Sequence, residues 1–291
     1  LFYGLLVGDG VSIVRASTML ILYFVAEVLG RSYCIISALS ISAVAICLIS
    51  PFEPFGLSFQ LSFSAVLSLG GPIAFIIKRF KSKEKQKEID YKQKLFETLV
   101  VSIGIQLLTL PITLYYFYIF PMYAFLINIA VIPLMSFVIY SSMLSLLLNI
   151  LRTILYKYVS VFTVLILRFY DLLCTVTNHL PYHSIVFGRP KLWQMLIYYI
   201  LLLLIIAISV LRGRKIYLLF SIFAVIVLYP FLKTESVVYL DVGQGDGIYM
   251  HIDDLDILID GGSTSKPSLG EYSMEPFLLY KGVDDIEMSF I

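Results

Sequence analysis

Apolar residues form a series of long runs that occupy most of the chain. A helix of roughly 20 apolar residues crosses a bilayer core about 30 Å thick. The runs that approach this length predict about eight membrane-spanning helices, at residues 11–29, 33–50, 57–77, 95–119, 122–150, 153–178, 192–211 and 216–232.

The sixth run, 153–178, gives the weakest signal. Lys157, Arg168 and Asp171 interrupt it and leave only a short apolar core, VSVFTVLIL. An amphipathic helix lying in the plane of the membrane is the alternative interpretation. We keep the run as a span because the distribution of positive charge along the chain is then consistent.

Beyond residue 233 the hydrophobic pattern changes to a period of two. Residues 237–242 alternate between two faces, and the apolar segments 248–252 and 255–260 follow after turn-forming residues. This pattern predicts three short strands joined by tight turns. Residues 277–291 then predict a helix and the beginning of another strand. A module of this size buries too little surface to be stable alone, so we expect the chain to stop inside a domain.

The composition agrees with a membrane protein, because 59% of the residues are hydrophobic and 14% are charged. The formal net charge of +1 does not indicate a polyanionic partner, since the positions of charges matter more than their sum in a membrane protein. The sequence does not begin with Met, and no charged segment precedes its first apolar run, so we predict no signal peptide at Leu1. We therefore expect the chain to begin inside a longer protein.

Positive charges are concentrated in two loops. Residues 78–94 carry eight Lys and Arg against three acidic residues, and RGRK occupies 212–215. The positive-inside bias assigns both loops to the cytoplasm. If every run spans, the two loops fall on the same side and the part after Leu232 lies outside. We predict a membrane domain at 1–232 and an extracytoplasmic module at 233–291.

Acidic residues beside glycines are the candidate chemical groups of the C-terminal module. Asp241 and Asp246 flank a Gly-rich turn, and Asp260 ends an apolar strand immediately before Gly261. A carboxylate at the end of a strand is held rigidly beside open backbone, which suits a metal ion or a catalytic loop. Such residues are also common turn formers, and this alternative stays open. We expect His251 to be a satisfied structural side chain.

Arg15 is the most costly residue of the predicted membrane helices. A charge at a helix centre costs about 2.5–3.5 kcal/mol on insertion scales. Arg15 lies near the predicted outer end, so extension to the interface and a pore-lining role are both open.

The run 57–77 carries Gln60 and several serines, and a Gly-Gly-Pro sequence at 70–72 breaks it. Irregular backbone at this depth either packs in protein or lines a wet cavity, with tight packing of small residues as the alternative.

Stretches at both ends of the chain resemble one family. The segments GLLVGDG, VRASTML and LISPFEPFGLSFQLSFSAVLSLGGP are similar to the membrane domain of ComEC-type DNA internalisation proteins. VYLDVGQGDGIYMHIDDLDILIDGG resembles the start of the metallo-β-lactamase-like domain that follows in that family. The resemblance implies a polytopic α-helical membrane protein followed by the truncated N-terminal part of an αββα metallo-β-lactamase-like domain.

The resemblance also implies roles for particular residues. The membrane signature corresponds here to Arg15, Phe59, Gln60, Leu61, Ser62 and Phe63. The opening signature of the module corresponds to Asp241, Gly243, Gln244, Gly245 and Asp246. Asp260, followed by Gly261, matches an acidic residue that braces the metal-ligand loop of metallo-β-lactamase folds.

The function implied is a channel component that carries single-stranded DNA across a bacterial plasma membrane during natural transformation. The outer module of the family is associated with degradation of the strand that is not transported. A membrane-anchored metallo-hydrolase or nuclease, and a small-solute transporter with a soluble tail, remain the alternatives. The expected partners are single-stranded DNA, membrane lipid, a surface DNA receptor, a cytoplasmic DNA-translocating ATPase and a further copy of the chain.

Parts of the family pattern are missing from the sequence. The histidine-rich motif H-x-H-x-D-H, which supplies metal ligands in the fold, is expected beyond Ile291, and further family domains are expected before Leu1. We therefore predict no metal site, no catalytic residue and no nuclease activity in this polypeptide alone. A divalent metal, zinc or manganese, is expected only in the full-length protein.

Overall fold

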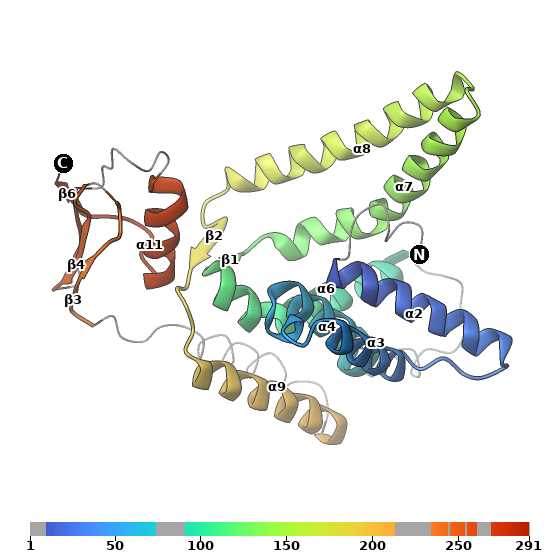
Figure 1. Cartoon of the computed structure of the whole chain (residues 1–291), viewed down its shortest axis with the longest axis horizontal. Helices are drawn as coiled ribbons and strands as arrows, with labels where there is room; N and C mark the ends of the chain where they lie inside the picture. Colours follow the sequence, from blue (N-terminus) through green and yellow to red (C-terminus); the bar gives the residue numbers. More distant parts are fainter. Residues whose placement is uncertain are drawn as a thin grey trace. The chain divides into compact units, whose positions relative to one another are not determined.

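The computed structural model describes residues 10–73, 91–212, 234–243, 245–253, 255–260 and 269–290 (Figure 1). The last predicted span, 216–232, and most of the basic loop 78–94 lie outside these residues. The boundary predicted between 232 and 233 also lies outside them and stays a prediction.

Helices dominate the described part of the chain. They are α2 (Val11–Val28), α3 (Ile35–Ile49), α4 (Leu57–Ser68), α6 (Tyr91–Phe117), α7 (Ala124–Ile150), α8 (Leu155–Asn178) and α9 (Leu192–Arg212), together with the short helix η1 (Glu53–Phe55). Seven of the predicted spans thus correspond to a helix, because long apolar runs favour helical backbone once their polar groups must bond internally.

Four helical segments are long and apolar enough to cross a membrane, judged by length and composition: Val11–Val28, Glu97–Phe117, Leu126–Ile150 and Leu155–Asn178. Three further apolar helices are shorter, Ile35–Ile49, Leu57–Gly71 and Leu192–Leu204. The weakest predicted run forms the unbroken helix α8, so its charged residues do not interrupt the backbone. The structure is that of a mainly helical membrane protein, with four candidate spans among the described residues.

The helix α4 ends in irregular backbone, as its glycines and proline predict. It is followed directly by the π-helical turn η2 (Leu69–Ile73), whose sequence is LGGPI. Proline removes a hydrogen-bond donor, and glycine tolerates wider backbone, so this sequence disfavours a regular α-helix. Two other helices of the described part contain an internal proline, Pro111 in α6 and Pro133 in α7.

The chain folds into two compact units. The first comprises Leu1–Ser64, Thr109–Phe120 and Ile185–Ile291, and the second Ala65–Leu108 and Pro121–Ser184. The second unit contains the helical hairpin α7–α8. Within it Thr163 Oγ1 donates to Ser141 Oγ at 2.7 Å, and Tyr170 Oη donates to the Val131 carbonyl at 3.2 Å. Hydrogen bonds between neighbouring helices stabilise the packing of apolar helices.

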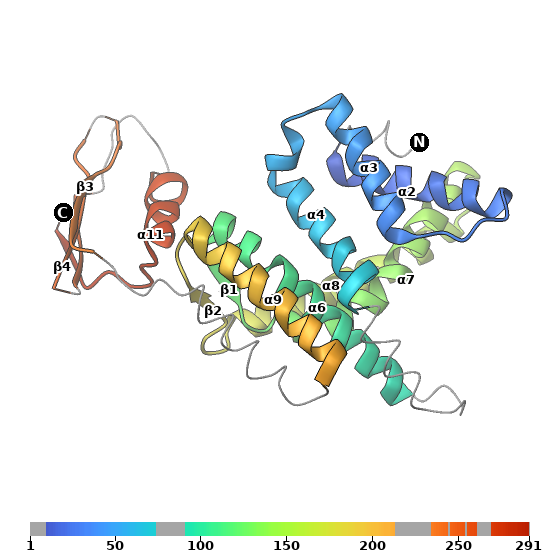
Figure 2. The ribbon, with the colours of Figure 1, turned by 90° about the horizontal axis from the view of Figure 1, so that it is seen from below.

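The C-terminal module, residues 234–290, contains a four-stranded sheet. Its strands are β3 (Ser236–Tyr239), β4 (Ile248–Ile252), β5 (Leu255–Ile259) and β6 (Met288–Phe290), in this spatial order. The first three are antiparallel neighbours, and β6 pairs parallel to β5. The π-turn η3 (Gly270–Met274) and helix α11 (Glu275–Lys281) connect β5 to β6, and α11 covers one face of the sheet (Figure 2). The three predicted strands and the helix-then-strand prediction are confirmed.

The first strand is shorter than predicted, because β3 ends at Tyr239. The predicted alternation nevertheless continues to Val242, which is only 2% exposed and packs with Leu269 and Met274. Leu240 and Leu258 pack around the same small core. The sequence LDVG therefore leaves the sheet while its apolar side chains stay inside the module.

Elsewhere in the described part, β1 (Ile119–Pro121) and β2 (Ser184–Val186) pair as a two-stranded sheet.

Candidate functional site

Arg15 lies on α2 and contacts the middle of α4. Its Nη1 atom donates to the main-chain carbonyl of Ser62, and its Cζ atom lies 6.0 Å from the centroid of the Phe63 ring. Ser12, one turn earlier on α2, donates through Oγ to Ser62 Oγ at 3.3 Å. The structure thus brings together the two separated parts of the membrane signature. We call this group, with Phe59 and Gln60, the signature cluster.

The remaining signature residues order α4 itself. Phe59 and Phe63, four positions apart and hence on one helix face, stack with centroids 3.9 Å apart and planes inclined by 13°. Gln60 Nε2 donates to the Pro54 carbonyl at 3.3 Å, and the Ser64 hydroxyl donates to the Gln60 carbonyl. Leu61 is half-buried. The amide of Gln60 therefore fixes α4 to the preceding turn η1.

The guanidinium of Arg15 is only partly satisfied. Its Nε atom is buried and has no hydrogen-bond partner among the residues that the structure describes. A guanidinium presents several donors in one plane and matches the geometry of carboxylate and phosphate groups. Burial among helices strengthens such an interaction, because the surrounding dielectric constant is low. The cluster therefore has the chemistry of an anion contact.

The acidic signature of the C-terminal module forms a tight loop between β3 and β4. Asp241 Oδ1 accepts a hydrogen bond from the Gly243 amide at 3.3 Å, and the Leu240 amide donates to the Gly247 carbonyl at 2.7 Å. Asp241 and Asp246 are exposed, as is Gly245, whereas the intervening Val242 is buried. The turn-forming interpretation accounts for Asp241, since a carboxylate that accepts from the amide two positions later makes an Asx turn. Gln244 lies outside the described residues.

We expect Gly243→Ala to destabilise this loop by about 1–2 kcal/mol, because Gly243 has a φ of +83° and left-handed backbone is strained for residues with a Cβ. Hydrogen–deuterium exchange of β3 and β4 in the full chain should be accelerated by this substitution. Gly270→Ala is the matched control, since its added Cβ would lie within 4 Å of no described atom outside its chain neighbours and its own helical turn. Equal exchange in the two variants would show that the loop has no need of glycine at position 243.

Asp260 follows β5 directly and adopts a φ of +47°. Its amide donates to the Phe290 carbonyl of β6 at 2.7 Å, so the residue continues the parallel pairing past the end of the strand. Gly261 lies outside the described residues. Among the described residues no group of three or more His, Cys, Asp or Glu side chains gathers as a metal site. The bracing role of Asp260 stays a prediction.

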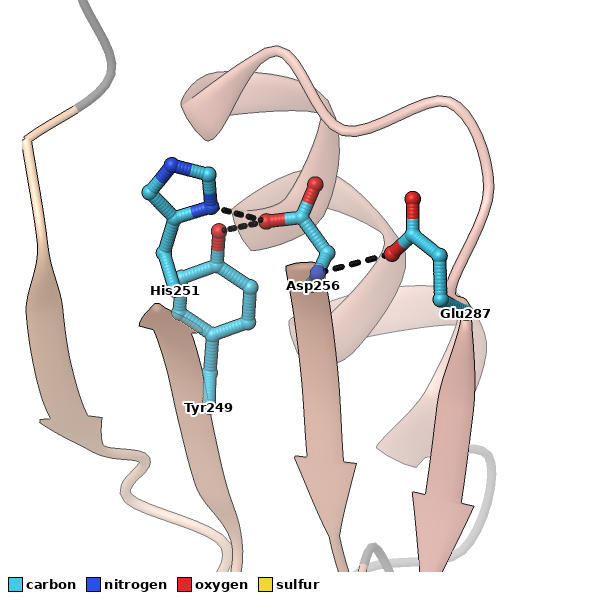
Figure 3. A network of polar contacts seen from close by, with 4 residues as sticks. All are labelled: Tyr249, His251, Asp256 and Glu287. Carbon is cyan, nitrogen blue, oxygen red and sulfur yellow. Dashed lines mark hydrogen bonds and ion pairs between the residues drawn. The ribbon is translucent and has the colours of Figure 1, made fainter. Parts of the chain in front are cut away.

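A buried polar network lies elsewhere in the module, where sequence reasoning identified only His251 (Figure 3). His251 Nδ1 and the Tyr249 hydroxyl both bond to Asp256 Oδ1, at 2.8 and 2.6 Å. Glu287 Oε2 accepts from the Asp256 amide at 2.7 Å. His251 and Asp256 are each 3% exposed and Tyr249 is 1% exposed. The expectation that His251 is a satisfied structural residue agrees with these contacts.

Burial and the bond to Asp256 both raise the pKa of Tyr249, so its phenol stays protonated and acts as the donor. A signal for this network exists in the sequence. Two residues, at 253 and 254, separate the strands, and a two-residue hairpin loop places 252 opposite 255 and hence His251 opposite Asp256. Asp253 has the positive φ, +49°, that such a loop requires. Tyr249 lies on the same face two positions before His251.

Residues 1–212 match the family described as competence proteins. A similar protein is "ComE operon protein 3" of Bacillus subtilis (strain 168), which is 25% identical over 314 aligned residues. The alignment covers 98% of this chain and 38% of that relative, so the chain spans well under half of the relative's length. No solved structure matches the chain.

Proposed function

This chain belongs to the competence protein family, and from that premise we propose that it takes part in the uptake of DNA during natural transformation. The specific role that we propose is that of a channel component which conducts single-stranded DNA across the plasma membrane. The observation that carries the proposal is the signature cluster, in which a partly satisfied guanidinium lies between two apolar helices. A passing phosphodiester is an anion that such a group recognises.

The irregular turn η2 at the end of α4 supports the same role. Backbone that departs from the α-helix is tolerated at membrane depth where it is packed in protein or lines a water-filled cavity. Helix α4 also carries a series of serine hydroxyls and the amide of Gln60, which are unusual on a helix that only anchors a soluble domain. A single apolar helix is sufficient for an anchor, so several candidate spans favour a path through the membrane.

We further propose that the chain crosses the membrane about eight times and that the C-terminal module is extracytoplasmic. Alkaline phosphatase, which is active only outside the cytoplasm, tests this topology in two fusions. A fusion after residue 233 should be active, and one within the basic loop 78–94 should be inactive. Activity in the second fusion, or its absence in the first despite equal expression, would contradict the eight-span arrangement.

For the module we propose a metallo-β-lactamase-like domain of which this chain holds the first part. Its metal ligands, for zinc or manganese, are then supplied by residues beyond Ile291 in the full-length protein. The same proposal assigns to the complete protein a surface DNA receptor, a DNA-translocating ATPase and a second copy of itself as partners. Metal analysis of the intact protein and of a version ending at Ile291 tests the ligand assignment, with metal expected only in the intact protein.

The function itself is tested by deleting the gene in a competent host and following labelled DNA. For a channel component we expect that labelled DNA still binds to the surface of the deletion strain but no longer enters its cytoplasm. Normal uptake in the deletion strain would contradict the proposal. Loss of degradation of the second strand with normal entry of DNA would instead favour the anchored-nuclease alternative, and a change in solute accumulation alone would favour a transporter.

A further inference from the structure

The last turn of α6 contacts two other parts of the first compact unit. On one side Tyr115 holds Arg189, which follows β2: Arg189 Cζ lies 4.0 Å from the Tyr115 ring centroid, and Arg189 Nη2 donates to the Tyr115 hydroxyl. Arginine stacked on an aromatic face combines a cation–π contact with a flat van der Waals surface. This geometry ties the segment after β2 to α6.

Arg189 and its neighbours also contact the C-terminal module. The Arg189 amide donates to the Tyr280 carbonyl of α11 at 3.1 Å, and Arg189 Cζ lies 5.7 Å from the Tyr280 ring centroid. The rings of Tyr118 and Tyr280 meet edge to face, with centroids 5.6 Å apart and planes at 89°. Three aromatic rings and one cation thus join the end of α6 and the following Tyr118 to the end of α11.

Two glycines allow the backbones to meet at this contact. A Cβ atom on Gly188 would lie 3.0 Å from the Gly282 nitrogen and 3.1 Å from its Cα atom. Gly188 and Gly282 also have positive φ angles, +71° and +77°. Neither backbone can give way as a flexible side chain would, so a side chain at position 188 would separate the segments.

On its other side the same turn contacts the segment before α4. Tyr116, adjacent to Tyr115, donates through its hydroxyl to the Phe55 carbonyl at 2.8 Å. Phe55 is the last residue of η1, to which Gln60 also bonds through Pro54. The final turn of α6 therefore supports the start of the signature helix as well as the module.

We propose that the last turn of α6, together with the following residue Tyr118, is a two-sided joint that holds the C-terminal module in a fixed position relative to the signature helix α4. Tyr115 and Tyr118 form the module side, through Arg189 and Tyr280, and Tyr116 forms the α4 side. Arg189 acts here as a positioning residue. This joint is a feature of the chain's own architecture and is independent of the proposed function.

Distances between paired spin labels test the joint in the full chain. Labels replace Phe52, beside η1, and Tyr272, in η3, which are 83% and 75% exposed. The native cysteines Cys34, Cys47 and Cys174 are free and are first replaced by serine. We expect a narrow distance distribution in this parent and a broad one in Gly188→Ala and in Arg189→Ala. Gly270→Ala, which adds a Cβ in open space within the module, should leave it narrow.

Two further measurements separate loss of the joint from unfolding. Tyr116→Phe removes only one hydroxyl and should also broaden the distribution, from the α4 side. A second label pair, at Val28 and Leu48 on the neighbouring helices α2 and α3, should be unaffected by every variant. If Gly188→Ala disturbs this pair, the exposed Arg189 decides the question. A broad distribution in the parent, or a narrow one in Arg189→Ala, would overturn the proposal.

Discussion

Replacement of Arg15 by leucine is expected to lower DNA uptake about 10- to 100-fold in a competent host that produces the intact protein. Removal of a hydrogen bond to a charged group costs about 1.5–3 kcal/mol, and each 1.36 kcal/mol changes a rate tenfold. A leucine at position 15 would keep the apolar contact with Phe63 but lose the donor to the Ser62 carbonyl and the only cation of the signature cluster described above. Entry of labelled DNA into the cytoplasm is the measurement.

Protein abundance distinguishes this effect from misfolding. Leucine inserts into a membrane more readily than arginine, by about 3 kcal/mol at a helix centre, so the amount of membrane-inserted protein should not fall. Arg15→Lys keeps the charge but not the planar fork of donors, and we expect an intermediate loss. Ser40→Ala removes only an exposed hydroxyl that bonds within α3, to the Ile36 carbonyl at 3.0 Å, and is the matched control with normal uptake. Normal uptake by Arg15→Leu would exclude an essential cation at this position.

The helices were predictable from the sequence because length and apolar composition suffice to define them. The run that became α8 illustrates this, since its continuous backbone tolerates the charges that weakened the prediction. The contact of Arg15 with Ser62 was not predictable, because the residues are 47 positions apart and depend on how α2 crosses α4. The resemblance to a family named both residues as one signature without indicating that they touch.

The same distinction holds in the C-terminal module. The local sequence pattern predicted β4 and β5. The two-residue length of the loop between them determines the register that pairs His251 with Asp256. No local pattern links Tyr115 to Arg189, which are 74 positions apart. Contacts between distant segments require the tertiary arrangement, and the sequence signals only their glycines and aromatic residues.

The polar network of the module should be its most sensitive point, and we expect Asp256→Ala to lower the free energy of opening of the module by about 3–5 kcal/mol. The substitution removes the acceptor shared by His251 and Tyr249 and leaves two buried donors unpaired. The Asp256 amide keeps its bond to Glu287, so the loss isolates the carboxylate. Hydrogen–deuterium exchange of β4 and β5 in the full chain should become about 100- to 4,000-fold faster.

A graded series of substitutions tests whether the faster exchange comes from loss of the polar network rather than from any substitution in this part of the sheet. Asp256→Asn retains an acceptor oxygen, and Tyr249→Phe removes one donor, so each should accelerate exchange by a smaller factor, about tenfold for the loss of a typical hydrogen bond. Asp253→Asn, in the adjoining turn at a φ of +49° that asparagine tolerates, should have no effect. Similar exchange in Asp256→Ala and Asp253→Asn would mean that the buried carboxylate adds nothing to the stability of the module. In that case the sheet would be held by the core around Val242 and by its cover, α11.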